Sequence, residues 1–199
     1  MTPFKQLESV VVPLIRDNID TDAIIPSREI LSVSKTGLAD GLFAGWRYID
    51  NTRNPNPEFA LNQPQYAGAS ILAGGANFGC GSSREQAVWA LLEYGFRVIL
   101  APSFNPIFRR NCVRNGILPI VCDAGEIAAE EGPAHVDLPN RSITTRNRRW
   151  AFSIDEETAT MLLHGLDEIE LTLKKEREIG AFRAADRHRR PWAYLPLAN

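Results

Sequence analysis

The sequence predicts an α/β fold, because apolar segments of strand length alternate with helix-forming segments in the middle of the chain. A strand–helix–strand–helix–strand order at this spacing is typical of an α/β unit. The strands are expected at 69–73, 96–101 and 117–121, and the helices at 84–94 and 103–115. Gly95 and Gly116 directly follow the two helices, where glycine commonly ends a helix.

The flanking segments extend this unit on both sides. Residues 8–15 form a further strand, and weak alternation over 135–155 predicts a hairpin on the sheet edge. Connections without regular structure, or with one short helix, are expected at 17–26, 27–46 and 51–66, and a short helix at 156–166. We divide the chain into a domain over residues 1–172 and a charged C-terminal helix and arm over 173–199.

Composition excludes several classes of protein. The chain has 199 residues and a net charge of −2, so its bulk charge indicates neither nucleic acid nor an anionic membrane as a partner. It contains no apolar run long enough to span a bilayer, and its N-terminus lacks the pattern of a signal peptide. We therefore expect a protein of the cytoplasm.

The three cysteines, Cys80, Cys112 and Cys122, are widely spaced and form no CxxC pair. The three histidines stand in no zinc-like spacing with them. An iron–sulfur cluster usually needs three or four thiolates, some of them close in sequence. We therefore expect this chain alone to bind no metal, and we interpret Cys112 and Cys122 as small buried residues.

The segment NFGCGSSRE, from Asn77 to Glu85, is the strongest candidate for a site. Gly79 and Gly81 allow a tight turn before a helix. Ser82, with Glu85 three residues later, matches a capping box and predicts an N-cap. Helix N-termini attract anions, and Arg84 adds a guanidinium suited to a carboxylate. These features predict a site for a substrate that carries carboxylates.

Three other interpretations of the segment stay open at this point. The serines can simply cap a helix, with Arg84 solvated. A phosphate or dinucleotide loop is less consistent with the sequence, since the segment matches neither GxGxxG nor GxxxxGK[ST]. Cys80 as a nucleophile needs a neighbouring histidine that sequence alone cannot place.

Several separated motifs resemble one family. GCGSSREQA is similar to the GSSRE signature of the aconitase family's swivelling domain, and DNIDTDAIIP resembles the opening motif of isopropylmalate dehydratase small subunits. The segments KTGLADGLFAGWRYID, PNPEFALNQPQYAGASIL and YGFRVILAPSFNPIFRRNCVRNGILPI also resemble that bacterial subunit. The likeness runs from about residue 8 to about residue 170, and it implies a swivelling β/β/α domain with a mixed sheet and a partly closed β layer.

The resemblance implies a hydro-lyase that interconverts 2-isopropylmalate and 3-isopropylmalate through 2-isopropylmaleate, in leucine biosynthesis. Ser82 takes the role of catalytic base, while Ser83 and Arg84, with the backbone at Gly81, bind a substrate carboxylate. The [4Fe-4S] cluster of the family acts as a Lewis acid. Because this chain lacks clustered cysteines, we expect the cluster on a large subunit, and no activity from the small subunit alone.

Two departures concern the substrate. Gln86 stands where the family often has His. The loop after DTDAIIP sets substrate choice in the family, and here it offers Arg28 and Lys35 as cations and Leu31 as an apolar contact, although these side chains can equally be solvated. Alternatives are therefore a small subunit for methylmalate, dimethylmalate or homoaconitate, or an anion-binding module without catalysis. The acids Asp17, Asp20 and Asp22 are interpreted as turn formers, since the loop lacks the glycine and distal glutamate of a calcium site.

Overall fold

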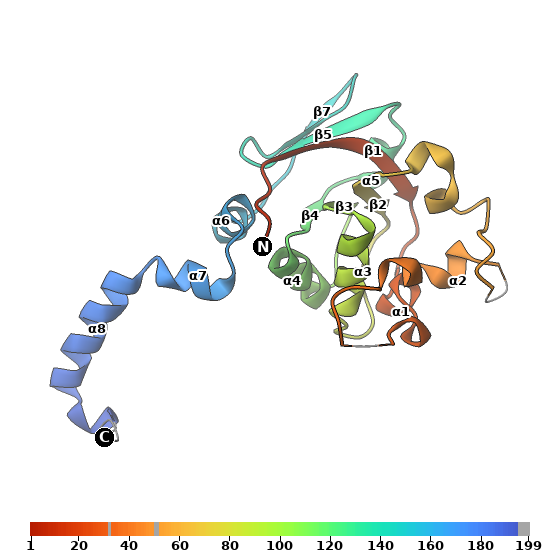
Figure 1. Ribbon diagram of the computed structural model, residues 1–199. Coiled ribbons are helices and arrows are strands. Elements are labelled where there is room, and N and C mark those ends of the chain that lie inside the picture. The colour runs from red at the N-terminus through yellow and green to blue at the C-terminus, as the bar shows by residue number, and fades with distance from the viewer. Residues whose placement is uncertain (32, 50–51, 195–199) are drawn as a thin grey trace.

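A mixed seven-stranded sheet forms the centre of the computed structural model, which describes residues 1–31, 33–49 and 52–194 (Figure 1). The strand order is β4-β3-β2-β1-β5-β6-β7. The strands are β1 (Gln6–Leu14), β2 (Ile71–Gly74), β3 (Val98–Ala101), β4 (Leu118–Val121), β5 (Pro133–Asp137), β6 (Ser142–Thr144) and β7 (Arg149–Ala151). Strands β1 to β4 are parallel, and β5 to β7 continue the sheet antiparallel from β1.

Helices cover both faces of the parallel half. The α-helices are α1 (Thr21–Ile24), α2 (Ala44–Arg47), α3 (Gln86–Tyr94), α4 (Pro106–Asn115), α5 (Ala124–Ala128), α6 (Glu156–His164), α7 (Glu168–Leu173) and α8 (Glu176–Arg189). Short 3-10 turns are η1 (Ser27–Glu29), η2 (Ala39–Gly41), η3 (Ala60–Asn62), η4 (Pro64–Tyr66) and η5 (Pro191–Ala193). The α/β prediction is confirmed.

Two separate cores lie on the two faces of the sheet. Because side chains alternate along a strand, Val12 and Leu72 pack into one core with residues of α3 and α4. Their neighbours Val11 and Ile71 pack into the other core, together with residues of α5, β5 and α6. Figure 1 shows β5 and β7 bending over the parallel strands, with α5 beneath β1, so the sheet is curled and partly closed.

The elements agree with the sequence prediction in the middle of the chain and differ at two places. Gly95 and Gly116 adopt left-handed angles at the ends of α3 and α4, as expected. The hairpin expected over 135–155 is instead a three-stranded meander, in which β6 pairs with both β5 and β7, and β5 also pairs with β1. The helix expected from residue 84 begins two residues later, at Gln86.

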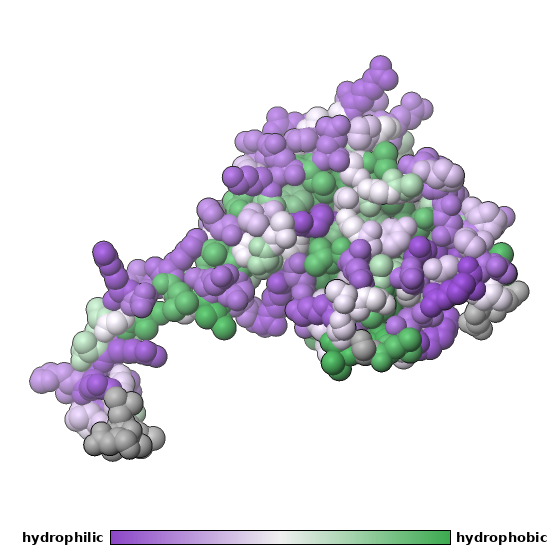
Figure 2. Space-filling view, in the orientation of Figure 1, coloured by the Kyte–Doolittle hydropathy of each residue, from purple (hydrophilic) through white to green (hydrophobic). Residues whose placement is uncertain are grey.

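The last two helices leave the body of the molecule (Figure 1). Helix α8 has only one buried residue, Asp186, and Figure 2 shows hydrophobic side chains on the surface over α7. The predicted boundary at 172/173 falls at the end of α7, and residues 195–199 of the predicted arm lie outside the described part of the chain. The two-part division itself stays a prediction. In the described part, no helix is long and apolar enough to cross a membrane.

Candidate functional site

The loops that follow β1 and β2 meet at the carboxyl ends of the parallel strands. Backbone hydrogen bonds join them in four places: Gly75 N donates to Arg16 O (3.1 Å), Asn18 N to Ala76 O (2.8 Å), Gly79 N to Ile19 O (2.7 Å) and Thr21 N to Cys80 O (2.9 Å). The carboxyl ends of parallel strands are where open α/β sheets bind ligands. The glycine motif therefore lies beside the DNIDTDAIIP motif, although about 60 residues separate them in sequence.

Gly79 allows the glycine motif to pass close over α4. Its φ is +74°, in the left-handed region, and a Cβ atom at this position would overlap the ring of Phe108. Gly81, one of the predicted substrate-binding residues, also has a positive φ, +89°, and is exposed. The turn that presents the serines thus depends on two positions that side chains would strain.

Ser82 is exposed, and its hydroxyl contacts the other loop. Its Oγ lies 3.0 Å from Oγ1 of Thr21, and Thr21 Oγ1 also donates to the Ser82 carbonyl oxygen at 3.2 Å. The side chain of Ser82 therefore has a partner 61 residues away in sequence rather than one in the following helix.

The predicted capping box is wrong. The N-cap of α3 is Glu85, which makes no side-chain capping hydrogen bond. The Glu85 carboxylate instead accepts hydrogen bonds from Asn115 Nδ2 (2.9 Å) and Trp89 Nε1 (3.3 Å). Because Ser82 contacts Thr21, residues 82–85 bend across the site before the helix begins. Ser82 lies ahead of the N-terminus of α3, and its hydroxyl does not cap the helix.

Arg84 is held by the loop after β1. Its Nη1 donates to Asp22 Oδ1 at 2.6 Å and to the Ile25 carbonyl oxygen at 3.2 Å. The hydrogen bond from Arg84 lowers the pKa of the Asp22 carboxyl, so this group is ionised at neutral pH. The Arg84 side chain is 20% exposed, and among the described residues its Nε and Nη2 have no hydrogen-bond partner. We call this side of the guanidinium its open edge, because its two donors suit a carboxylate.

Ser83 completes the candidate set, and it is exposed next to Ser82. The predicted residues Gly81 to Arg84 are thus presented together beyond the carboxyl ends of the parallel strands. The interpretation as turn formers holds for Asp20, which caps α1 by accepting from Ala23 N at 2.6 Å. Asp17 instead accepts from Ala76 N at 2.7 Å, and Asp22 pairs with Arg84. Sequence reasoning missed Thr21 and Asp22 as neighbours of the serines, since no local pattern connects the two loops.

The predicted substrate loop, 27–37, lies between α1 and α3, and its residue 32 is outside the described part. Arg28 pairs with Glu29 at 3.5 Å, and Lys35 Nζ lies 5.1 Å from the ring centre of Trp89 in α3. Leu31 is 90% exposed, and Figure 2 shows hydrophobic surface on the lower edge of the body, near α1. The structure gives none of the three a contact with Ser82 or Arg84, and their role in substrate binding stays a prediction.

Glu93 of α3 fixes the far end of this loop. Its carboxylate accepts hydrogen bonds from the backbone N–H groups of Gly37 and Leu38, both at 2.6 Å, and of Ala39 at 2.9 Å. Partial burial opposes ionisation of Glu93, but the three donors outweigh it and lower its pKa. The loop is therefore anchored on the same helix that follows the serines.

The cysteines do not form a cluster site. Cys112 is fully buried, and burial raises its pKa well above the ordinary value. Burial, with a contribution from Asp123, raises the pKa of Cys122 to about 12. Both thiols are therefore protonated and unreactive at neutral pH. Over residues 1–31, 33–49 and 52–194, no three His, Cys, Asp or Glu side chains are placed to hold a metal ion.

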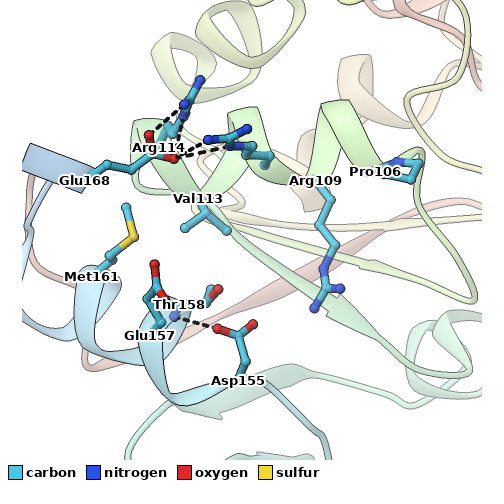
Figure 3. Close-up of a pocket in the computed structure, with 10 residues that line it drawn as sticks. Pro106, Arg109, Val113, Arg114, Asp155, Glu157, Thr158, Met161 and Glu168 are labelled. Atoms are coloured by element: carbon cyan, nitrogen blue, oxygen red, sulfur yellow. Dashed lines mark hydrogen bonds and ion pairs between the residues drawn. The ribbon is translucent and has the colours of Figure 1, made fainter. Parts of the chain in front are cut away.

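A separate hollow of about 440 Å³ lies between α4, α6 and the start of α7 (Figure 3). Arg109, Arg110, Arg114, Asp155 and Glu168 provide most of its charged lining. Figure 3 shows Arg114 directed toward Glu168. The Glu168 carboxylate accepts from Arg110 Nη2 at 2.9 Å and from Arg114 Nη2 at 2.7 Å. The guanidinium groups of Arg110 and Arg114 are thus engaged within the protein, and none of the predicted site residues lines this hollow.

Comparison with known proteins gives one family. Residues 1–125 match the aconitase C-terminal domain. A 3-isopropylmalate dehydratase small subunit from Cupriavidus necator is 53% identical, over 98% of this chain and 99% of that protein. The chain belongs to the family of 3-isopropylmalate dehydratase small subunits. Another member, from Magnetococcus marinus, is 47% identical over 98% of this chain and 100% of its own.

A solved structure supports the same family assignment. The crystal structure of 3-isopropylmalate dehydratase (leuD) from Methanocaldococcus jannaschii has a TM-score of 0.66 and 28% identity, and the match covers 89% of this chain and 99% of that one. The swivelling-domain fold expected from the resemblance is thereby confirmed for this small-subunit family member.

Proposed function

We propose that this chain is the small subunit of a 3-isopropylmalate dehydratase and supplies the base and a carboxylate-binding group to an active site shared with a large subunit. The reaction interconverts 2-isopropylmalate and 3-isopropylmalate through 2-isopropylmaleate, as a step of leucine biosynthesis. The observation that carries the proposal is the exposed Ser82 hydroxyl, presented beside the fixed guanidinium of Arg84 in a member of this family.

Ser82 Oγ takes the proton from the substrate carbon next to the one that carries the hydroxyl. A neutral serine is a weak base, so its alkoxide needs stabilisation from nearby donors and positive charge. Thr21 Oγ1, at 3.0 Å, is a donor within reach, and Arg84 two residues later adds positive charge. In the second half of the reaction Ser82 returns a proton to the other carbon of the alkene.

Ser83 and Arg84 bind a substrate carboxylate. The open edge of the guanidinium offers two parallel N–H groups, which match the two oxygens of a carboxylate. Asp22 and the Ile25 carbonyl hold the opposite side of Arg84, so the open edge is fixed before substrate arrives. Arg28, Lys35 and Leu31 of the 27–37 loop are proposed to face the rest of the substrate, with Leu31 against the isopropyl group.

The second half of the site comes from the large subunit, on which we place the [4Fe-4S] cluster. When bound there, the cluster supplies a Lewis acid for the substrate hydroxyl. In the described part of this chain, Cys112 and Cys122 belong to no group of three possible metal ligands. The small subunit alone is therefore expected to be inactive.

The test is to express the chain with its large subunit under anaerobic conditions and to assay 2-isopropylmalate. Ser82→Ala is expected to lower kcat by roughly 10²- to 10⁴-fold, the range for loss of a general base. Ser153→Ala, at an exposed serine between β7 and α6, is the matched control and should keep full activity. Full activity of Ser82→Ala would refute the base assignment.

The same assay separates the alternatives. Methylmalate, dimethylmalate and homoaconitate are offered to the two-subunit enzyme beside 2-isopropylmalate, and kcat/KM is compared. A preference for one of them would change the substrate and leave the roles of Ser82 and Arg84 in place. A complex that binds these acids without turning any of them over would favour the anion-binding module.

A further inference from the structure

Thr21 places a buried hydroxyl directly behind the proposed base. It is the first residue of α1 and is 1% exposed. Its Oγ1 lies 3.0 Å from Ser82 Oγ and 3.2 Å from the Ser82 carbonyl oxygen, so both contacts are to the same residue. Its backbone N–H is bound to the Cys80 carbonyl at 2.9 Å, which fixes the hydroxyl relative to the glycine motif.

The Thr21 hydroxyl has one proton and two acceptors within reach. A hydroxyl can donate once and also accept. While Ser82 is neutral, Ser82 Oγ donates to Thr21 Oγ1, and Thr21 donates to the Ser82 carbonyl. When Ser82 is an alkoxide, rotation about the C–O bond of Thr21 turns its proton from the carbonyl to Ser82 Oγ. No proton leaves Thr21 in either arrangement.

We propose that Thr21 is a positioning residue for Ser82: its hydroxyl orients Ser82 Oγ and donates to the alkoxide form. The inference rests on the proposed function, in which Ser82 is the base. Hydrogen bonds to an ionised group are about twice as strong as those between neutral groups, so this contact strengthens as Ser82 loses its proton. The contact therefore favours the reactive form over the resting one.

A purely structural role for Thr21 makes a different prediction. A buried hydroxyl that only satisfies its neighbours changes the stability of the fold when it is removed, not the proton-transfer step. Thr145 provides the comparison within this chain. It is also buried, and its Oγ1 donates to Glu130 Oε2 at 3.3 Å, with no contact to the serines.

The experiment uses the complete two-subunit enzyme with Thr21→Val, Thr21→Ser and Thr145→Val. Thr21→Val keeps the shape and removes the hydroxyl, while Thr21→Ser keeps the hydroxyl. We expect Thr21→Val to lower kcat by roughly 10- to 100-fold, with KM changed less than about 3-fold, as one lost charge-assisted hydrogen bond implies. Thr21→Ser should restore most of kcat, and Thr145→Val should leave it unchanged.

A second measurement uses substrate deuterated at the carbon that loses the proton. The resulting isotope effect on kcat does not depend on the stability of the fold. The isotope effect on kcat should rise in Thr21→Val, because proton removal becomes slower relative to the other steps. Wild-type kcat in Thr21→Val, or equal losses in Thr21→Val and Thr21→Ser, would overturn the proposal. If Thr21→Val does not fold, Thr21→Ala takes its place in the test. If neither variant folds while Thr21→Ser does, the hydroxyl is needed for stability, and the proposal is overturned.

Ser82→Ala is measured in the same series to separate the two proposals. If Ser82→Ala is active, the proposed base fails, and the inference about Thr21 fails with it. If Ser82→Ala is inactive while Thr21→Val has full activity, only the inference about Thr21 is refuted.

Discussion

The contacts of Arg84 fix the direction of its guanidinium group, so few other side chains could take its place. Arg84 lies in the loop after β2, and its Nη1 donates to the Asp22 carboxylate and the Ile25 carbonyl oxygen of the loop after β1. Asp22 is mostly exposed and Arg84 mostly buried, so the ion pair alone adds little to stability. Its effect is to fix the direction of the guanidinium, which matters for a planar group that binds carboxylates by two parallel hydrogen bonds.

Arg84→Lys is expected to raise KM for 2-isopropylmalate by roughly 10- to 100-fold in the two-subunit enzyme, because lysine keeps the charge and loses the fork. Steady-state kinetics at constant ionic strength measures this. Arg146→Lys, at an exposed position between β6 and β7, is the control. An unchanged KM for Arg84→Lys would show that a point charge is sufficient and that the open edge of the guanidinium binds no carboxylate.

At the scale of elements, Gly79 lets the turn before α3 pack directly against Phe108 of α4. Gly79 and Gly68 provide a matched pair, since their φ angles are +74° and +72°. A Cβ at Gly68 meets no atom within 4 Å, whereas at Gly79 it overlaps the Phe108 ring. The φ angles are therefore nearly the same at the two positions, while the packing around them differs.

Gly68→Ala should lower the free energy of unfolding by about 1–2 kcal/mol, the strain of a left-handed residue. Gly79→Ala should lower it by a further 1–3 kcal/mol or so, because the core has to move to accept the methyl group. Chemical denaturation of the small subunit, with both variants in parallel, measures the difference. If both variants lose the same free energy of unfolding, the Phe108 ring moves without cost, and its packing does not require glycine at position 79.

Much of this level of structure follows from the sequence. Gly95 and Gly116 end their helices in the left-handed conformation, and the apolar segments that follow them form β3 and β4, because these signals act within a few residues. The capping box at Ser82 failed for the opposite reason. Thr21, 61 residues away, provides the partner that a local pattern assigned to the helix N-terminus. The motif could be found from sequence, but its contacts could not.

For the whole molecule, α7 is held on the body by the Glu168 carboxylate and by Leu171, which packs against the core of α5, β5 and α6. Hydrogen bonds from Arg114 and Arg110 of α4 lower the pKa of Glu168, at the start of α7, to about 2. Since the folded pKa lies below the ordinary value near 4.5, this contribution to stability is complete above pH 4.5. It is lost as the pH falls from there toward 2. The groups are partly exposed, so the effect is local rather than global.

Glu168→Gln is expected to speed hydrogen exchange of the α7 amides at pH 7, because the ion pairs with α4 are lost. Glu157→Gln, in the same hollow, is the control and should leave α7 unchanged. The difference between wild type and Glu168→Gln should persist to about pH 4.5 and shrink toward pH 2. A difference that disappears near pH 6 would contradict the lowered pKa, and no difference at pH 7 would contradict the anchor.

The position of β1 has a consequence for the order of folding. Strand β1, the first strand of this sequence, lies in the middle of the sheet, and pairs such as Leu7 with Val136 join it to β5, far along the chain. Until β5 is synthesised, one edge of β1 has no partner strand, and the core that Val11 and Ile71 share with α5, β5 and α6 is incomplete. Unpaired edges recruit other chains, and contacts this distant in sequence form slowly. We therefore expect truncation before β5 to make the newly made subunit prone to aggregation, although the missing part carries none of the proposed catalytic groups.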